Sequence, residues 1–171
     1  MAIVVNQHEH IRGQISAPIE LVEYADYQCP YCRKAFYVMR DIQERLGQDL
    51  MFAFRNFPLT ELHANAMNAA LAAEAAAQQG KFWEMQMLLF DNQQYLQDYN
   101  LLEYAQKLKL DVSKFQADMN SEKCLQKVQK DYQSGVDNGV EGTPTFFING
   151  KRFEGDWRDD DFADFLLSFI E

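Results

Sequence analysis

A strand that leads directly into a pair of cysteines is encoded in the run Leu21-Val22-Glu23-Tyr24-Ala25-Asp26-Tyr27-Gln28-Cys29-Pro30-Tyr31-Cys32. Residues 19–24 are rich in branched and aromatic side chains and contain neither glycine nor proline, which predicts a β-strand. Pro30 suits the first position of a helix. From Cys32 to Leu46 apolar residues recur every three or four positions, which predicts an amphipathic helix that ends at Gly47. The cysteine pair is therefore expected at the start of a helix.

The spacing of the cysteines indicates chemistry rather than structural support. The chain has three cysteines, of which Cys29 and Cys32 have two residues between them and Cys124 stands alone. A disulfide that closes so small a loop stabilises a fold poorly. Thiol–disulfide exchange needs one thiolate that attacks and a second thiol nearby that resolves the mixed disulfide. Free N–H groups at a helix start favour the thiolate at Cys29, whereas Cys32 lies one turn later on the apolar side.

Other uses of a cysteine pair stay open at this point. A Cys-Pro-x-Cys run can form half of a zinc site, but a closed site needs four ligands, and the chain adds only Cys124 and three scattered histidines. Two buried cysteines without chemistry, and a pair that ligates an iron–sulfur cluster, are the remaining alternatives. Redox chemistry is favoured over all three, and no metal site is expected.

Length and composition restrict the class of protein. The 171 residues fit one domain or one domain with an insertion, and 47% hydrophobic and 25% charged residues are ordinary for a globular chain. The net charge of −10 argues against a nucleic-acid partner, because phosphate contacts need clustered lysine and arginine. No stretch approaches the roughly 18 apolar residues that span a membrane, so no membrane partner is expected.

The middle of the chain predicts a group of helices. Residues 62–138 contain no proline and are dominated by good helix formers. Asp111 and Ser121 are positioned as the N-caps of two of these helices. The expected helices lie near residues 63–79, 81–91, 99–109, 112–120 and 122–138.

The flanking segments have the pattern of strands. A second strand follows the first helix, and near the C-terminus a hairpin turn at Asn149-Gly150 joins two more strands. A closing helix comes last, with Phe165 and Phe169 among the residues expected to face the core. A βαβ unit and a ββα unit on either side of a helical insertion predict an α/β domain with a mixed sheet. The expected ranges are an irregular lead-in at 8–16, strands at 50–57, 143–148 and 151–154, and a helix at 159–170.

Three separate motifs resemble the DsbA-like family of thiol–disulfide oxidoreductases. They are the run Leu21 to Cys32, which resembles the active-site strand and helix; Arg55-Asn56-Phe57-Pro58-Leu59, the entry to the inserted helices; and Gly142-Thr143-Pro144-Thr145-Phe146-Phe147, the cis-proline segment. The resemblance implies a thioredoxin fold, in which helices flank a central mixed β-sheet, with an inserted all-helical subdomain. The implied division assigns residues 1–61 and 139–171 to the thioredoxin domain and residues 62–138 to the insertion.

The resemblance also implies roles for individual residues. Cys29 would attack, and Cys32 would resolve the mixed disulfide. Glu23, six residues before Cys29, matches a buried acid of thioredoxin-like proteins that exchanges a proton with the second cysteine. Pro144 would follow Thr143 in a cis peptide beside the cysteine pair, which leaves the Thr143 backbone to pair with an extended substrate.

One position departs from DsbA. Tyr31 stands where DsbA has a histidine, whose charge helps to hold the thiolate. Pro30 and Tyr31 form the dipeptide typical of glutaredoxins, and both are expected to contact substrate. We therefore expect Cys29 to be less acidic, and the disulfide to be less oxidising, than in DsbA.

The sequence thus predicts an enzyme that exchanges disulfides with protein or peptide thiols and disulfides, with the Cys29–Cys32 pair in place of any cofactor. A glutathione-linked reductase or deglutathionylase is a second interpretation, prompted by Pro30-Tyr31. A non-catalytic thioredoxin-fold module that binds a cluster or a polypeptide is a third. The N-terminus lacks the segments of a secretory signal, so we expect a cytoplasmic location, or a periplasmic one if the sequence is a processed mature form. We also expect a monomer.

Overall fold

The computed structural model describes residues 3–170, and within them a mixed sheet of five strands has the order β1-β3-β2-β4-β5. The central strands β2 and β3 are parallel, and β1, β4 and β5 join antiparallel. The mixed sheet predicted from the sequence is confirmed. Its strands are β1 (His10–Arg12), β2 (Ile19–Ala25), β3 (Leu50–Asn56), β4 (Thr145–Ile148) and β5 (Lys151–Arg152).

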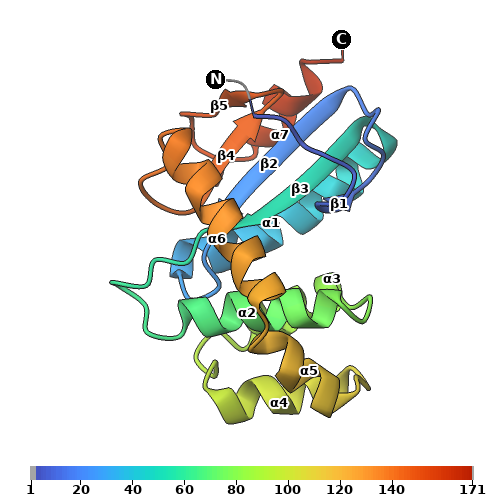
Figure 1. Ribbon diagram of the computed structural model, residues 1–171. Coiled ribbons are helices and arrows are strands. Elements are labelled where there is room, and N and C mark those ends of the chain that lie inside the picture. The colour runs from blue at the N-terminus through green and yellow to red at the C-terminus, as the bar shows by residue number, and fades with distance from the viewer. Residues whose placement is uncertain (1–2, 171) are drawn as a thin grey trace.

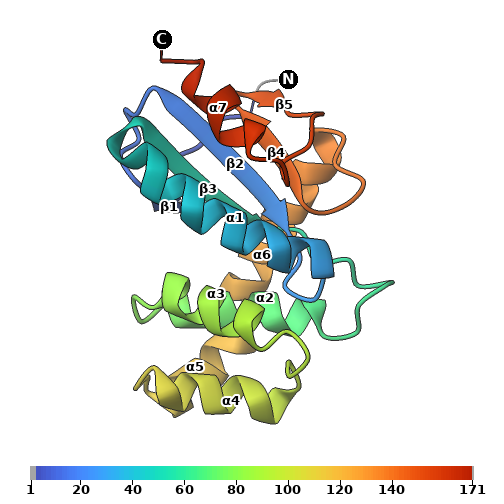
Figure 2. The same ribbon diagram turned by 180° about the vertical axis from the view of Figure 1, so that it is seen from behind.

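Helices cover both faces of the sheet and form a separate layer beyond its end. Figures 1 and 2 show α1 and α7 on one face, α6 crossing the other, and α2 to α5 gathered below the sheet. Among the described residues no helix is long and apolar enough to cross a membrane. The helices are α1 (Pro30–Leu46), the 3-10 helix η1 (Gly47–Asp49), α2 (Ala66–Ala77), α3 (Phe82–Asp91), α4 (Asp98–Lys107), α5 (Val112–Met119), α6 (Glu122–Asp137) and α7 (Asp161–Leu167).

The alternation of side chains along β2 determines what faces the active-site helix. Leu21 and Ala25 pack in the core on the α1 side, whereas Val22 and Tyr24 pack in a second core under α6. Because successive side chains of a strand point to opposite faces, Glu23 lies on the α1 side. Both faces of the strand are buried, as expected for the centre of a covered sheet.

The expectation that residues 8–16 are irregular is wrong for part of that segment. His10–Arg12 form β1 and pair with β3, with His10 opposite Phe54. The His10 ring stacks on Phe82 and bonds the buried carboxylate of Glu74 at 2.8 Å. A strand of three residues, of which only Ile11 is apolar, is too short to show a hydrophobic pattern, so only these contacts with distant residues reveal it.

The C-terminal elements are shorter than predicted. The strand after the helical region begins at Thr145, because Pro144 has no N–H to donate to a ladder. Asn149 and Gly150 form the expected turn, with φ of 49° and 85°. Phe165 and Phe169 do not face the core, since each is 44% exposed, and the closing helix spans only Asp161–Leu167.

Helix α6 joins the helical layer to the sheet. Ser121 caps it by accepting the Cys124 N–H, and Asp111 caps α5 in the same way, so both predicted N-caps are confirmed. The Cys124 side chain is buried. Farther along, Gly135 lies against Phe57, where an added Cβ would come within 2.7 Å of the ring. The absence of a side chain therefore lets α6 pack directly on the sheet.

Candidate functional site

Cys29 is the N-cap residue of α1. Its backbone is extended (φ −76°, ψ 123°), and the helix begins at Pro30. A hydrogen bond from Cys32 lowers the pKa of Cys29 most, the contact with Thr143 and the N–H groups of Cys32 and Tyr31 lower it further, and burial opposes them. The resulting pKa is about 6, against an ordinary value of 9.0. Cys29 is therefore largely a thiolate at neutral pH.

Cys32 lies one turn further along α1 and is fully buried. The backbone N–H of Asp26 donates to its sulfur at 3.4 Å. Burial raises the pKa of Cys32 well above its ordinary value, and the neighbouring Cys29 raises it further. Both thiols are free, which is the reduced form of the pair. Within residues 3–170 no group of three or more His, Cys, Asp or Glu side chains could hold a metal ion.

Glu23 is buried beneath the cysteine pair. Its side chain leaves β2 on the α1 side, opposite Phe54 and Phe146 in the neighbouring strands, and the residue is 2% exposed. Burial raises the pKa of Glu23 well above the ordinary value, and the charge of Cys29 adds to this effect. Among the described residues, Oε2 of Glu23 has no hydrogen-bond partner. The site therefore contains a buried acid whose surroundings favour its neutral form.

Thr143 and Pro144 lie beside Cys29, although they are far away in the sequence. The peptide bond between them is cis, and Cys29 Sγ lies 3.5 Å from the Thr143 carbonyl oxygen, to which its thiol form donates a hydrogen bond. Together with Tyr31 and residues 154–158 they line a surface cleft of about 430 Å³, and we call it the substrate cleft. Tyr31 is 54% exposed there. Pro30 is exposed at the helix start but does not line this cleft.

Asp26 holds the loop of the site together through three hydrogen bonds, a role that the sequence did not predict. Its carboxylate accepts hydrogen bonds from the N–H of Gln28 at 2.7 Å, the N–H of Leu59 at 2.9 Å and His63 Nδ1 at 2.8 Å. His63 precedes α2 rather than opening it, because that helix begins at Ala66. The Asp26 side chain thus ties the cysteine loop to the segment that enters the helical layer. Its position three residues before Cys29 was the only signal in the sequence.

Gln93 holds the same loop from the other side. Its Nε2 atom donates to the carbonyl of Cys29 at 2.7 Å and to the carbonyl of Tyr27 at 2.9 Å. Gln93 lies in the connection between α3 and α4, so it links the helical layer to the loop that carries Cys29. Sequence reasoning missed it, because a single glutamine in a glutamine-rich segment carries no distinguishing pattern.

The acidity of Cys29 leads to a direct prediction. Since only the thiolate is alkylated, the rate of Cys29 alkylation by iodoacetamide should rise with pH through a midpoint of about 6 and level off above it. The Cys29→Ser variant is the control, because Cys32 and Cys124 both have raised pKa values and should react slowly below pH 8. A midpoint near the ordinary thiol pKa would mean that the hydrogen bonds to Cys29 do not stabilise its thiolate. A midpoint near about 3.5 would equal the acidity of DsbA and contradict the expectation that Cys29 is less acidic.

The burial of Glu23 predicts how stability depends on pH. Because the pKa of Glu23 is raised in the folded state, the unfolded chain loses this proton first, and stability falls as pH rises above about 4.3. Glu23→Gln removes this loss, so the variant should gain stability over the wild type between pH 4 and 8. Urea unfolding of the reduced proteins measures the difference. Glu44→Gln, on the exposed side of α1, should show no such pH-dependent gain.

The fold is similar to that of known thioredoxin-like proteins. A family model described as Thioredoxin matches residues 5–167. The solved structure of BdbD from Bacillus subtilis has a TM-score of 0.81 and 24% identity, covering 95% of this chain and 92% of that one. The thiol-disulfide exchange protein alpha-DsbA2 from Wolbachia pipientis has a TM-score of 0.83 and 18% identity, covering 95% and 88%. The predicted thioredoxin fold with its DsbA-like helical insertion is confirmed.

Curated relatives with higher identity are much longer proteins. The chain is 40% identical over 153 residues to Na(+)/H(+) antiporter NhaA 1 of Mycobacterium sp. (strain KMS), covering 88% of this chain and 25% of that protein. It is also 40% identical over 155 residues to Na(+)/H(+) antiporter NhaA 3 of Salinispora tropica, covering 91% and 24%. The chain thus spans about a quarter of the length of these relatives, whose names describe the longer proteins.

Proposed function

Because the chain belongs to the thioredoxin family, we propose that it is a thiol–disulfide oxidoreductase acting on protein or peptide substrates. The observation that carries the proposal is the asymmetry of the cysteine pair. Cys29 has a lowered pKa and contacts the substrate cleft, whereas Cys32 is buried and has a raised pKa. Such a pair supplies one thiolate that attacks and a second thiol that is protected until it is needed.

The first step is an attack by Cys29. Its thiolate attacks one sulfur of a substrate disulfide, a new S–S bond forms to Cys29, and the substrate S–S bond breaks and leaves a substrate thiolate. The carbonyl of Thr143 and the ring of Tyr31 lie at the cleft where the substrate chain would run. The Thr143 backbone beside Pro144 offers a partner for an extended peptide, and Tyr31 contacts that peptide from the helix start. Pro30, exposed beside the cleft, would contact only a part of the substrate that extends beyond the cleft.

The second step is resolution by Cys32. Cys32 loses its proton and attacks Sγ of Cys29, which forms the Cys29–Cys32 disulfide and releases the second substrate thiolate. Glu23, the buried acid on the same side of β2, accepts that proton after its own proton has been lost to solvent, and in the reverse direction it gives its proton to the leaving Cys32 thiolate. The substrate gains two electrons and the cysteine pair loses two. The reverse sequence oxidises a substrate dithiol, so the pair requires no further cofactor.

The direction of exchange depends on the compartment and on the partner. A pKa of about 6 for Cys29 lies between the values of about 7 in thioredoxin and about 3.5 in DsbA. We therefore propose that the reduction potential of the Cys29–Cys32 pair lies between those of thioredoxin and DsbA. In the cytoplasm, where a reducing glutathione pool prevails, the chain would act as a monomeric reductase of protein disulfides. Reduction of glutathione mixed disulfides is the alternative enzyme activity that Pro30-Tyr31 suggests.

Equilibration with glutathione redox buffers tests the proposal. We expect a two-electron couple between about −270 and −120 mV, the values of thioredoxin and DsbA. A value near or below about −230 mV would support a reductase, and one near −120 mV an oxidant of an oxidising compartment. The Cys29→Ser variant is the control and should show no couple. Failure of the wild type to exchange with glutathione or with insulin would refute the enzyme and leave a binding module.

A further inference from the structure

The substrate cleft is lined by carboxylates and aromatic rings as well as by the cis-proline segment. Its volume is about 430 Å³, and it begins beside Cys29, whose Sγ lies 3.5 Å from the carbonyl oxygen of the lining residue Thr143. Residues 154–158, in the connection between β5 and α7, supply most of the lining, and Tyr31 and Pro144 complete it. A substrate bound to Cys29 would therefore lie against this connection.

Packing on the core fixes residues 154–158 in place. The backbone of Gly155 runs so close to the Phe153 ring that an added Cβ would come within 2.6 Å of it. The Phe153 ring in turn packs against the buried Phe162 of α7, with 4.8 Å between the ring centroids. Trp157 packs against the same core and remains partly exposed. The polar residues of this segment are therefore held at defined positions in the cleft.

The charges of this segment do not cancel. Arg158 donates to both carboxylate oxygens of Asp156, at 3.0 and 3.3 Å, so these two opposite charges neutralise each other. Glu154 is exposed, and among residues 3–170 no lysine, arginine or histidine forms an ion pair with its carboxylate. The described part of the chain adds no further charged residue to the lining. The substrate cleft therefore carries one uncompensated negative charge.

Further carboxylates lie next to the substrate cleft. Arg158 also lines a second cleft, of about 270 Å³, between α1 and α7. In that second cleft Arg45 lies 3.8 Å from Asp41, whereas the exposed acids Asp159 and Asp160 form no ion pair with the described part of the chain. A peptide that leaves the substrate cleft on this side would therefore meet more negative charge.

Two arginines close to the site in the sequence or in the sheet bond elsewhere. Arg33, four residues after Cys29, donates to the carbonyl of Phe90 on α3 at 3.0 Å. Arg152 on β5 donates to the carbonyl of Gly139 at 2.7 Å. Neither arginine lines the substrate cleft, so neither compensates its negative charge.

We propose that the substrate cleft selects peptides with a lysine or arginine beside the reacting disulfide, and that Glu154 is the residue that determines this preference. The inference rests on the proposed function and names its substrate class. Glu154 attracts the cationic side chain, and the rings of Tyr31 and Trp157 offer faces to which an ammonium or guanidinium group binds favourably. Peptides with carboxylates at the same positions are repelled.

The same preference distinguishes protein substrates from glutathione. Oxidised glutathione has more carboxylates than ammonium groups, so its net charge is negative and the cleft disfavours it. Protein segments with lysine or arginine beside a cysteine are favoured instead. The preference depends on salt, because the screening length falls from about 30 Å at 0.01 M to about 3 Å at 1 M.

Exchange rates with matched peptides test the preference. Each substrate is a disulfide-linked dimer of a capped peptide X-Gly-Cys-Gly-X, in which X is lysine, glutamate or glutamine. The reduced protein converts one dimer into two peptide thiols and itself becomes the Cys29–Cys32 disulfide, and separation of the acid-quenched products gives the second-order rate constant. Each rate constant is divided by that of dithiothreitol with the same dimer, which corrects for the effect of the flanking charges on the disulfide itself.

The expected order of the normalised rates is lysine, glutamine, glutamate. At about 0.01 M salt the lysine dimer should react at least about tenfold faster than the glutamate dimer, and at about 1 M salt less than about twofold faster. Oxidised glutathione should react more slowly than the glutamine dimer.

Variants with opposite expected signs assign the preference to the cleft. Glu154→Gln should lower the lysine-to-glutamate ratio at least about threefold, because an exposed ion pair is worth up to about fivefold and the two peptides respond in opposite directions. Arg158→Gln frees a carboxylate of the lining, so it should raise the ratio. A structural role of this segment would not move the ratio in opposite directions.

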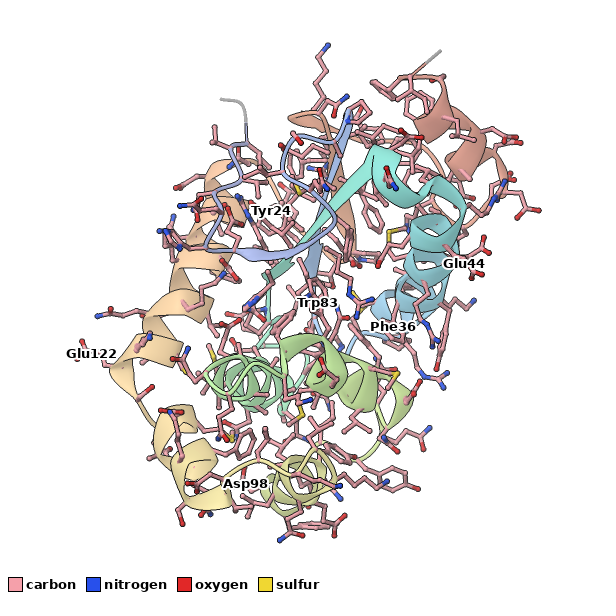
Figure 3. The ribbon with its side chains drawn as sticks, turned by 90° about the vertical axis from the view of Figure 1, so that its right-hand side faces the viewer. Tyr24, Phe36, Glu44, Trp83, Asp98 and Glu122 are labelled. Carbon is pink, nitrogen blue, oxygen red and sulfur yellow. The ribbon has the colours of Figure 1, made fainter. Side chains whose placement is uncertain are left out.

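Two control variants make the same changes in net charge far from the cleft. Glu103→Gln and Lys107→Gln both alter exposed residues of α4. Figure 3 shows this helix, on which Asp98 is labelled, at the opposite end of the molecule from α7. Both controls should keep the ratio of the wild type.

Three results would contradict the inference. Equal normalised rates for the three dimers would refute the preference and leave the proposed function intact. A ratio that Glu154→Gln changes no more than Glu103→Gln would mean that the preference comes from the net charge of −10 of the whole chain and not from the cleft. If the protein exchanges with none of the dimers while dithiothreitol reduces them, the proposed function fails and the inference fails with it.

Discussion

Cys29→Ser should lower the rate of disulfide exchange by about 10³-fold or more, to the uncatalysed background. Serine cannot form the S–S bond on which both steps depend, and its hydroxyl is not ionised at neutral pH. The loss should appear in the reduction of insulin disulfides at pH 7, with the fold unchanged because the substitution is nearly isosteric. Cys29 is the first sulfur that a substrate in the cleft would meet, since its Sγ reaches the Thr143 carbonyl.

Two matched variants separate the roles of the cysteines. Cys32→Ser retains the attacking thiolate but lacks the resolving thiol, so it should accumulate a mixed disulfide on Cys29 that mass spectrometry detects. Cys124→Ser should exchange at the rate of the wild type, because its sulfur is buried in α6. Retained exchange in Cys29→Ser together with a loss in Cys124→Ser would mean that the site has been assigned to the wrong sulfur.

Asp26→Ala should have the largest effect on stability, a loss of about 3–5 kcal/mol in the free energy of unfolding. The carboxylate is fully buried and accepts three hydrogen bonds, two from backbone N–H groups and one from His63. Its removal leaves these donors without an acceptor, and each buried donor left unsatisfied costs about 1–3 kcal/mol. Urea unfolding with linear extrapolation measures the loss.

His63→Ala is the matched comparison for Asp26. It removes one donor that is partly exposed and leaves both backbone donors bonded to the carboxylate, so it should cost only about 1 kcal/mol. Asp26→Ala should also raise the rate at which the loop opens, which would appear as faster alkylation of Cys32. A cost for Asp26→Ala no greater than that for His63→Ala would show that the carboxylate does not hold the loop.

The sequence predicted well those elements whose pattern is local. The strand before the cysteines, the helix after them and the five inserted helices have strong periodicity or composition, and the structure places all of them within a few residues of expectation. Strand β1 could not be predicted, because it depends on the edge of β3 and on the His10 contacts with Glu74 and Phe82. Likewise, Phe165 has the spacing of a core residue, but α7 is too short to bury it.

The candidate site divides in the same way. Cys29, Cys32 and Glu23 are adjacent along one strand and helix, so their positions follow from the spacing in the sequence. Thr143 and Pro144 could be associated with them only through the resemblance to a family. The contact of Gln93 with Cys29 and the hydrogen bonds of Asp26 could not be predicted from the sequence, because they depend on how distant loops pack. The assigned roles of Glu23, Thr143, Pro144, Pro30 and Tyr31 in catalysis and substrate binding stay predictions.

The burial of Cys124 has a consequence for the redox stoichiometry of the chain. Burial raises the pKa of this thiol, and its residue lies in the first turn of α6, away from the strand and helix that carry the pair. A protonated, enclosed sulfur is neither a good nucleophile nor accessible to a second chain. Oxidation therefore withdraws two electron equivalents per chain, both from Cys29 and Cys32. On the proposed mechanism the protein alternates between three thiols and one.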